Sequence, residues 1–293
     1  MENVVTEARA ANALWKEKWP APAKLNLMLR ITGRRDDGYH LLQTVFQMLD
    51  LCDWLTFHPL EQDRVCLQEP IPGVAEADDL TVRAANLLKE ISGCRQGVRI
   101  EVEKNLPMGG GLGGGSSDAA TTLVVLNQLW SLGLSTEELM RLGLRLGADV
   151  PVFVFGCAAW GEGVGEELQE IVVPEQWVVV IKPNVHVDTG KIFTHEGLTR
   201  DSKAIKIADF LAGDQRNDCF EVVCKLYRSV EKAWEALSGY AEARLTGTGA
   251  CVFAQFASER EARQAYAELQ GDWQVYLAKG QNRSPLYQKL SHY

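Results

Sequence analysis

The chain has 293 residues, 46% of them apolar and 24% charged, which is enough for two ordinary folded domains and excludes a disordered chain. Its 30 basic and 39 acidic residues leave a formal net charge of −9, which argues against binding nucleic acid through a basic face. A local basic niche for one small anion remains compatible with that charge.

The chain begins with a polar segment, residues 1–19, which has mixed charge and lacks the apolar core of a secretory signal. We expect a short tail, either helical or an extension upstream of the folded protein. From Ala23 to Thr32 apolar and polar residues alternate, and this period of two predicts a half-buried strand. The sequence GRRDDG at 33–38 predicts a turn, and residues 41–60 predict one or two further strands.

Apolar residues recur at helical spacing through the middle and the end of the chain. This spacing predicts helices at 79–91, 116–130, 136–146, 218–237 and 259–269. Short apolar runs predict strands at 98–103, 177–182, 250–256 and 273–278. Strands first, then helices, then a mixture of both indicate an α+β chain with two lobes, 1–160 and 161–293.

A glycine-rich segment, LPMGGGLGGGSSDAATTL, lies between a predicted strand and a predicted helix and holds six glycines in seven residues. Glycine lets backbone N–H groups crowd against an anion and adopt positive φ. Ser116 and Ser117 stand where the helix begins, so hydroxyl and N–H groups can converge on phosphate oxygens, helped by the helix dipole. We therefore predict a polyphosphate site. Its candidate residues are Pro107, Met108, Gly109, Gly110, Gly111, Leu112, Gly113, Gly114, Gly115, Ser116 and Ser117.

A dinucleotide site, a Walker A loop and a plain turn compete with the polyphosphate site as interpretations of this segment. Gly109, Gly111 and Gly114 form GxGxxG, but the acidic strand end that a dinucleotide site needs about 20 residues later is replaced by helical pattern. A Walker A loop needs a lysine directly before the serines, and none stands there. A plain flexible turn stays open, although six glycines would cost considerable folding entropy.

Two charged residues, Lys24 and Asp149, are candidates for a catalytic role. Lys24 lies beside Asn26 on the polar face of the first predicted strand, where a lysine is more commonly a solvated charge. Asp149 precedes a very apolar run that we expect to be a strand, and an aspartate there is more commonly a turn or cap residue. Spacing alone does not join these residues to the glycine-rich segment.

Three segments, in this order, resemble the three motifs of the GHMP kinase superfamily: PAKLNL at 22–27, PMGGGLGGGSSDAA at 107–120 and LTGTGACVFA at 245–254. The resemblance implies two lobes, the N-terminal one like domain 2 of ribosomal protein S5 and the C-terminal one of the GHMP type. It implies an ATP-dependent kinase that uses Mg²⁺. The metal ligands stay unassigned, because Asp118 is either a ligand or a first-turn acid that interacts with the helix dipole.

A finer resemblance, over residues 22–53 and in GADVPVF at 147–153, is to one branch of this superfamily. That branch phosphorylates the 2-hydroxyl of a cytidine diphosphate-linked methylerythritol, on the non-mevalonate route to isoprenoid precursors. The resemblance implies that Asp149 is the general base, that Lys24 pairs with its charge and reaches the substrate, and that Asn26 helps orient that substrate.

The resemblance also implies a binding site for the cytosine. Tyr39 and Phe193 match aromatic residues that sandwich the base, and His40 matches a histidine that hydrogen-bonds it. The alternative is that these are two core aromatics and a satisfied polar group. The matched third motif implies that Gly247, Thr248 and Gly249 wall the site, although a hairpin turn would explain them too.

Lys104 and the pair Asp79–Leu80 match positions near the adenine in the family, where an asparagine is usual at the position of Asp79. This departure puts a side-chain contact from Asp79 to adenine in doubt. The rival functions are another GHMP kinase, acting on mevalonate, homoserine or a sugar, and a catalytically silent nucleotide-binding protein.

Seven cysteines are scattered without CxxC spacing, which is typical of reduced thiols in a cytoplasmic protein and not of a disulfide scaffold or zinc site. No stretch reaches about 18 uninterrupted apolar residues, so no membrane span is expected. We predict a cytoplasmic protein with a small-molecule substrate and neither a nucleic-acid nor a membrane partner. Both a monomer and a homodimer are compatible with the sequence.

Overall fold

The computed structural model describes residues 14–36 and 38–293. Its strands are β1 (Lys18–Arg34), β2 (His40–Leu60), β3 (Val65–Leu67), β4 (Gly97–Glu103), β5 (Ala159–Glu162), β6 (Glu167–Glu170), β7 (Trp177–Lys182), β8 (Ala243–Leu245), β9 (Val252–Phe256) and β10 (Gln274–Gln281). Its helices are α2 (Leu80–Ser92), α3 (Gly114–Leu129), α4 (Thr136–Leu146), α5 (Val150–Phe155), α6 (Thr189–Thr194), α7 (Ile207–Leu211), α8 (Phe220–Leu226), α9 (Arg228–Ser238), α10 (Glu259–Leu269) and α11 (Pro285–Leu290). Helices and strands mix along the chain, so the predicted α+β class is confirmed.

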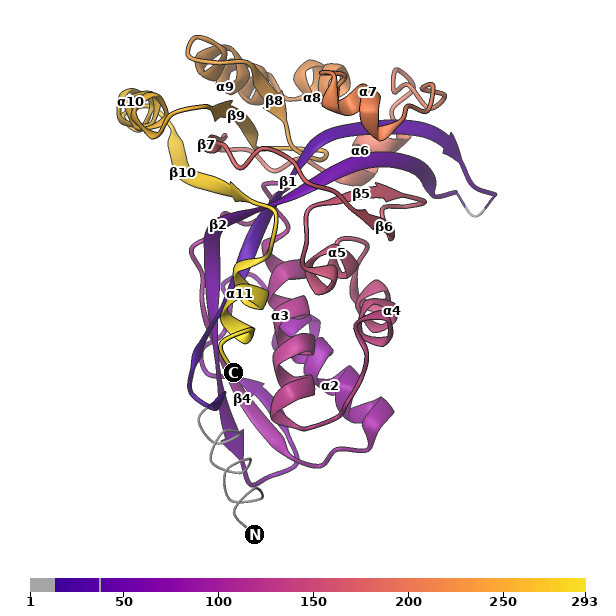
Figure 1. Ribbon diagram of the computed structural model, residues 1–293, viewed down its shortest axis with the longest axis vertical. Coiled ribbons are helices and arrows are strands. Elements are labelled where there is room, and N and C mark those ends of the chain that lie inside the picture. The colour runs from indigo at the N-terminus through magenta and orange to yellow at the C-terminus, as the bar shows by residue number, and fades with distance from the viewer. Residues whose placement is uncertain (1–13, 37) are drawn as a thin grey trace.

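The elements form two lobes that share the long strands β1 and β2 (Figure 1). In the first lobe, β1, β2, β4 and β3 pack against α3 and α2, with α4 and α5 alongside. In the second lobe, β10, β7, β9 and β8 pair in that order and pack against α9 and α10. The two parts join where Gly280 and Gln281 of β10 pair with Leu49 and Met48 of β2. Each lobe therefore has its own core around one continuous sheet.

The polar face predicted for the first strand is not exposed. Lys24, Asn26 and Arg30 are as buried as the apolar residues opposite them, so the prediction of a half-buried strand is wrong. The reason is tertiary, because segments of the chain far from β1 cover its second face. The backbone N–H of Asn26, for example, donates to Thr246 Oγ1 at 3.0 Å. Irregularities in the pairing with β2 lie on both sides of this stretch, and such bulges re-aim side chains.

Two further elements differ from the predictions. Residues 150–155 form the short helix α5 and not a strand: Pro151 fits the first turn of a helix, and a run buried on all sides has no periodicity that separates the two forms. The helix predicted at 218–237 is two helices, α8 and α9, because the chain leaves helical geometry at Tyr227. The hydroxyl of Tyr227 accepts the N–H of Asp188 at 3.3 Å, which fixes this break.

The predicted tail, 1–19, is too long at its end. Residues 1–13 lie outside the described residues, but Lys18 and Trp19 belong to β1 and Trp19 is fully buried. The turn predicted at 33–38 is shorter as well, because β1 runs to Arg34, while residue 37 lies outside the described residues.

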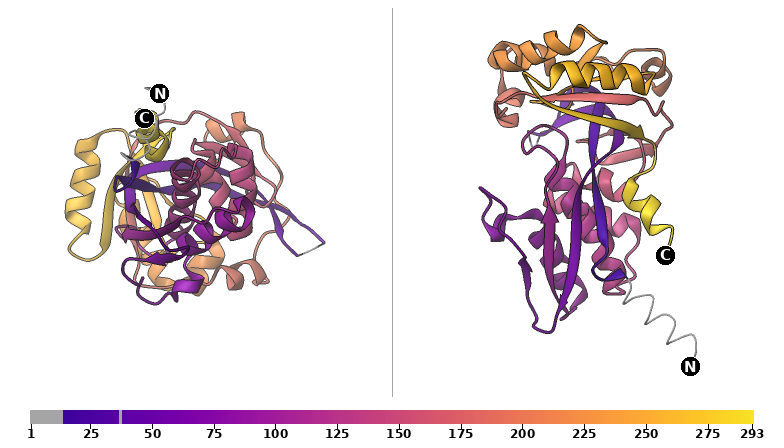
Figure 2. Two further views of the ribbon diagram at one scale, coloured as in Figure 1. Left: turned by 90° about the horizontal axis from the view of Figure 1, so that it is seen from below. Right: turned by 90° about the vertical axis from the view of Figure 1, so that its left-hand side faces the viewer.

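The last helix, α11, returns to the first lobe, as Figure 2 shows. Leu286 lies in the first lobe's core, and Lys289 pairs with Glu17 at 2.9 Å, so residues 161–293 do not all stay in the second lobe. The lobe boundary near residue 160 stays a prediction. No helix among the described residues is long and apolar enough to cross a membrane.

Candidate active site

A cavity of about 830 Å³, called the cleft below, is lined by all three of the motifs singled out in the sequence. Gly109, Gly111 and Ser116 contribute from the glycine-rich segment, Lys24 and Asn26 from β1, and Gly247, Thr248 and Gly249 from the segment between β8 and β9. Asp149, Tyr39, His40 and Phe193 line it as well. The fold therefore brings together residues that lie more than two hundred positions apart, which sequence spacing could not show.

The chemical centre of the cleft is a contact between Lys24 and Asp149. Lys24 Nζ lies 3.2 Å from Asp149 Oδ2 and 2.6 Å from Asn26 Oδ1. The lysine side chain is only 3% exposed, whereas the aspartate is 41% exposed and opens to the cleft. The amide of Asn26 is held in turn, because its Nδ2 donates to Thr44 Oγ1 at 2.9 Å. The result is a buried cation fixed from two sides beside a carboxylate that a ligand can reach.

The glycine-rich segment packs closely enough on its neighbours that two of its positions exclude any side chain. A Cβ added to Gly111, whose φ is +78°, would lie 2.8 Å from the backbone oxygen of Thr246. A Cβ on Gly113, with φ of +76°, would lie 2.7 Å from the ring of Phe153 and 3.3 Å from Lys24 Cε. The N–H of Lys24 donates to the Leu112 carbonyl at 3.0 Å, so the segment is bonded to β1 directly.

Only some of the predicted phosphate-site residues of the segment line the cleft. α3 begins at Gly114, two residues earlier than predicted, and Ser116 in its first turn reaches the cleft. Ser117 does not, because it is fully buried and its hydroxyl has no hydrogen-bond partner in the described part of the chain. The other predicted phosphate-site residues that do not line the cleft are Pro107, Met108, Gly110, Leu112, Gly113, Gly114 and Gly115.

In the lining of the cleft the ring of His40 stacks on Phe193, with centroids 4.9 Å apart and planes at 22°. Tyr39 beside it is 64% exposed. Burial, and then the charges of Arg200 and Arg34, lower the pKa of His40, so its neutral form dominates at pH 7. Arg200 Nε donates to His40 Nε2 at 3.3 Å, which leaves the proton of the neutral ring on Nδ1.

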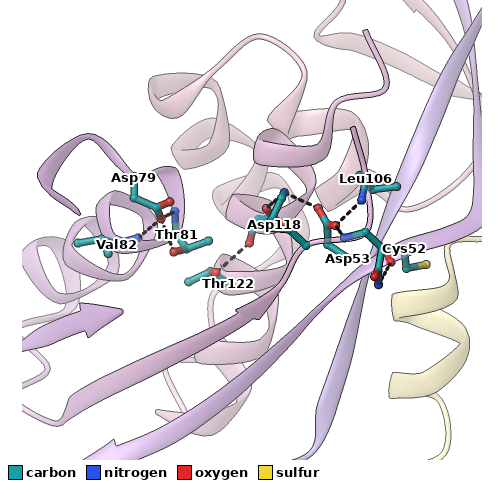
Figure 3. Close-up of polar contacts among 10 residues, drawn as sticks. Cys52, Asp53, Asp79, Thr81, Val82, Leu106, Asp118 and Thr122 are labelled. Carbon is teal, nitrogen blue, oxygen red and sulfur yellow. Dashed lines mark hydrogen bonds and ion pairs between the residues drawn. The ribbon is translucent and has the colours of Figure 1, made fainter. Parts of the chain in front are cut away.

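Lys104 and Asp79, which the resemblance places near adenine, do not line the cleft. The ammonium of Lys104 bonds to the carboxylates of Asp53 and Asp118. Asp79 caps α2, because its carboxylate accepts the N–H groups of Thr81 at 2.8 Å and Val82 at 3.3 Å (Figure 3). Both side chains are thus engaged within the protein. This weakens the case for a side-chain contact from either residue to the nucleotide.

Asp118 is buried behind the glycine-rich segment, and one of its carboxylate oxygens has no partner in the described part of the chain. Burial is the main cause that raises the pKa of Asp118 from 3.8 to about 7, against the opposing charge of Lys104. A residue buried and paired in this way is not placed to hold a metal on ATP in the cleft.

The pKa of Asp118 predicts a pH-dependent cost in stability. From about pH 4 to pH 7 the folded protein retains a proton that the unfolded chain has released, so the free energy of unfolding falls as pH rises through this window. The fall is at most about 1.4 kcal/mol per pH unit. We expect Asp118→Asn to melt at a higher temperature relative to wild type at pH 8 than at pH 5. A melting difference that is the same at both values would contradict this, and Asp63→Asn, which breaks the Lys89–Asp63 ion pair nearer the surface, serves as the control.

Three residues of the cleft and its rim carried no signal in the sequence. His186 lines the cleft, and its Nδ1 lies 3.0 Å from where a Cβ on Gly109 would stand. Thr189 shares a hydrogen bond between hydroxyl groups with Thr248 at 2.9 Å, and Arg200 holds His40. None belongs to a motif with regular spacing, so only the fold reveals them.

Two family matches, together with this site, define the class of protein. The family GHMP kinases N terminal domain matches residues 79–157, and the family GHMP kinases C terminal matches residues 196–274. A mevalonate kinase crystal structure matches with a TM-score of 0.65 over 91% of this chain and all of the other. At 15% identity that likeness concerns the fold alone. Two lobes around a glycine-rich segment with a Lys–Asp pair make this a GHMP kinase.

Closer relatives narrow the family. The chain is 57% identical over 273 residues to the 4-diphosphocytidyl-2-C-methyl-D-erythritol kinase of Methylococcus capsulatus, a match that covers 93% of this chain and 94% of that one. A crystal structure of 4-(cytidine 5′-diphospho)-2C-methyl-D-erythritol kinase matches with a TM-score of 0.79 at 30% identity, over 90% of this chain and 99% of that one. The chain belongs to the 4-diphosphocytidyl-2-C-methyl-D-erythritol kinase family.

Proposed function

We propose that the chain transfers the γ-phosphoryl group of ATP to the 2-hydroxyl of 4-diphosphocytidyl-2-C-methyl-D-erythritol. The observation that carries the proposal is the 3.2 Å contact between Lys24 Nζ and Asp149 Oδ2, in a cleft that runs from the glycine-rich segment to the His40–Phe193 ring pair. A cleft of about 830 Å³ is at the upper end of ordinary ligand pockets and suits two ligands that meet at this contact.

Asp149 would accept the proton of the acceptor hydroxyl, for which its partly exposed carboxylate is available. Lys24 would compensate the negative charge that gathers on the transferred group, and Asn26 would orient both Lys24 and the acceptor. Phosphoryl transfer requires mainly positioning and charge stabilisation from a protein. A cation held rigidly by Asn26 and Asp149 meets that requirement, because it does not have to reorganise during the reaction.

The first lobe would bind ATP, with backbone N–H groups of residues 108–116 around the phosphates, and the second lobe would contribute to acceptor binding. Mg²⁺ keeps several waters and is usually held by phosphates with one or two protein oxygens. The hydroxyl of Ser116 at the cleft offers such an oxygen, so the residues present fit an ion that arrives with ATP. The ion would neutralise phosphate charge when bound.

The cytosine would lie between Tyr39 and Phe193. Because the ring of His40 covers Phe193 in this structure, His40 has to swing aside for the base to stack there. From that position its neutral ring offers one donor and one acceptor to the edge of the base. Gly247, Thr248 and Gly249 would form the wall beside the acceptor, braced by the hydrogen bond between the hydroxyl groups of Thr248 and Thr189.

The function is tested by offering the purified protein ATP and Mg²⁺ with one acceptor at a time and measuring ADP release. The acceptors are 4-diphosphocytidyl-2-C-methyl-D-erythritol, the same alcohol phosphate without the cytidylyl group, mevalonate and homoserine. We expect rapid ADP release with the first acceptor only. Equal turnover with mevalonate or homoserine would contradict the substrate, and no turnover with any of them would contradict the kinase itself.

Replacing Phe193 by alanine is expected to raise KM for the cytidylyl acceptor about 10-fold or more, because stacking of a base on an aromatic ring contributes about 1–3 kcal/mol. KM for ATP should stay unchanged, since Phe193 belongs to α6 and not to the glycine-rich segment that is proposed to bind the phosphates. Steady-state kinetics with each substrate varied in turn gives both values. Phe220→Ala, which removes an aromatic packed on Trp234 outside the cleft, is the matched control. An unchanged acceptor KM in Phe193→Ala would exclude stacking.

A further inference from the structure

A buried network of charges lies behind the glycine-rich segment, outside the cleft (Figure 3). Its centre is Asp53 of β2, whose side chain is fully buried. Asp53 Oδ1 accepts the backbone N–H groups of Asn105 at 2.5 Å and of Leu106 at 2.7 Å, the residue directly before the segment and the first residue of the segment. The side chain of Asn105 donates back to the Cys52 carbonyl at 3.1 Å. The entrance to the glycine-rich segment is thus bonded to β2 at three points.

The exit from the segment meets the same carboxylate. A Cβ added to Gly114, the first residue of α3, would lie 3.5 Å from Asp53 Oδ2 and 3.4 Å from Leu106 Cβ. Leu106 and Gly114 therefore pack together on Asp53, although seven residues separate them in the chain. Both ends of the stretch 107–113 therefore lie against the same side chain of β2, that of Asp53.

Lys104 ties a third element to this point. Its ammonium bonds to Asp53 Oδ2 and, at 2.7 Å, to Asp118 Oδ2 in the first turns of α3. Although burial lowers it, the charges of Asp118 and Asp53 together raise the pKa of Lys104, so the ammonium stays charged at neutral pH. The end of β4, the strand β2 and the start of α3 are thereby cross-linked by one lysine and two carboxylates, without contact with the cleft.

We infer that Asp53 is a positioning residue for phosphoryl transfer, which fixes both ends of the glycine-rich segment so that its N–H groups are pre-arranged for the ATP triphosphate. The inference rests on the proposed function in that the segment binds phosphate. Six glycines make the free segment costly to order, and a binding site that is ordered before the ligand arrives avoids this cost at binding. An ionised acceptor is suited to this task, because hydrogen bonds to a carboxylate are about twice as strong as neutral ones.

The loss of a residue that only supports the fold would change ligand affinities in a different way from the loss of a residue that fixes the conformation of this segment. Loss of a merely structural residue lowers the affinity for every ligand of the cleft as the folded population falls. Loss of the anchor for residues 107–113 instead lowers the affinity for the phosphates of the nucleotide. It leaves the affinity for adenosine and for the acceptor as they were. The ratio of triphosphate affinity to adenosine affinity therefore reports the positioning role directly.

The test compares wild type, Asp53→Ala, Asp53→Asn and Asp218→Asn. Asp218 is a matched control in the second lobe: a buried carboxylate that likewise accepts a backbone N–H, from Ile31 at 2.8 Å, and pairs with a cation, Arg216. Dissociation constants for adenylyl imidodiphosphate with Mg²⁺, for adenosine and for the acceptor are measured by calorimetry, with thermal melting to establish the folded state.

We expect Asp53→Ala to bind the triphosphate analogue about 10- to 100-fold more weakly, since two hydrogen bonds to a charged acceptor are lost. The affinity of Asp53→Asn for the triphosphate analogue should lie between those of wild type and Asp53→Ala. Its amide oxygen still accepts from the two N–H groups, but its NH₂ faces Lys104. Binding of adenosine and of the acceptor should be unchanged. If the alanine variant does not fold, the asparagine variant decides.

Wild-type triphosphate affinity in a folded Asp53→Asn and Asp53→Ala would overturn the inference. So would an equal loss for all three ligands, or the same loss in Asp218→Asn. Because these measurements need no turnover, they are independent of the acceptor. Wild-type protein that binds the analogue but phosphorylates no acceptor would contradict the proposed function and leave the role of Asp53 to be decided by the binding ratio.

Discussion

Replacing Asp149 by asparagine is expected to lower kcat by about 10²- to 10⁴-fold with little change in the affinity for ATP. Asparagine has the same shape and keeps one oxygen near Lys24 Nζ, so the cleft should keep its form. What it loses is the ability to take a proton from the acceptor hydroxyl. Stopped-flow or single-turnover measurement of phosphoryl transfer, together with nucleotide binding by calorimetry, separates the two effects.

The chain provides a matched control for this variant, an aspartate whose cation partner lies on the same strand as Lys24. Asp214 is 41% exposed, like Asp149, and pairs with Arg30, a cation of β1 that is as buried as Lys24. Arg30 and Asp214 do not line the cleft, so Asp214→Asn makes the same chemical change away from it and should leave kcat within about a factor of two. Turnover of Asp149→Asn close to that of Asp214→Asn would remove Asp149 from the role of base.

The parts of the fold that local pattern determines could be predicted. Strong helical spacing located α4 and α10 within a residue, because their buried faces repeat with the period of a helix. The short run at β7 was located equally well by its β-branched residues, although its four central residues are all buried. Two of the failures share a physical cause, which is burial on every side. A run such as 150–155 shows no periodicity when all its faces are covered, and Lys24 and Arg30 look solvent-facing until segments more than a hundred residues later cover them.

The candidate site, like the fold, has one part that could be predicted from local sequence and another that could not. The glycine-rich segment could be recognised from the sequence alone, because so many clustered glycines have few uses other than a close approach of the backbone to an anion. The contact between Lys24 and Asp149, and that of Arg200 with His40, join residues more than a hundred positions apart, and no spacing rule encodes them. Asp53 is harder to predict still, since β2 holds two aspartates, Asp50 and Asp53, and no pattern distinguishes them. Only its bonds to the N–H groups of Asn105 and Leu106 reveal the role of Asp53.

Replacing Lys24 by methionine is the second change with a large expected effect, a fall in kcat of about 10²- to 10³-fold, the loss typical of one fixed group that stabilises transition-state charge. Stability should change little or rise. Methionine fills the same volume beside the ring of Phe46, which lies 5.5 Å from Lys24 Nζ, and water can solvate the partly exposed Asp149 that is left without its cation.

Activity and stability should therefore separate in this variant, and that separation distinguishes a lysine used for chemistry from one used for folding. Arg30→Met removes a cation of equal burial from the same strand and leaves Asp214 without its partner. We expect this variant to have a lower or unchanged melting temperature and an unchanged kcat. Thermal melting and steady-state kinetics on both variants give the comparison. If Lys24→Met and Arg30→Met lost activity only in proportion to their loss of folded protein, Lys24 would be structural, and the charge on the transferred phosphoryl group would have to be met by something other than this buried ammonium.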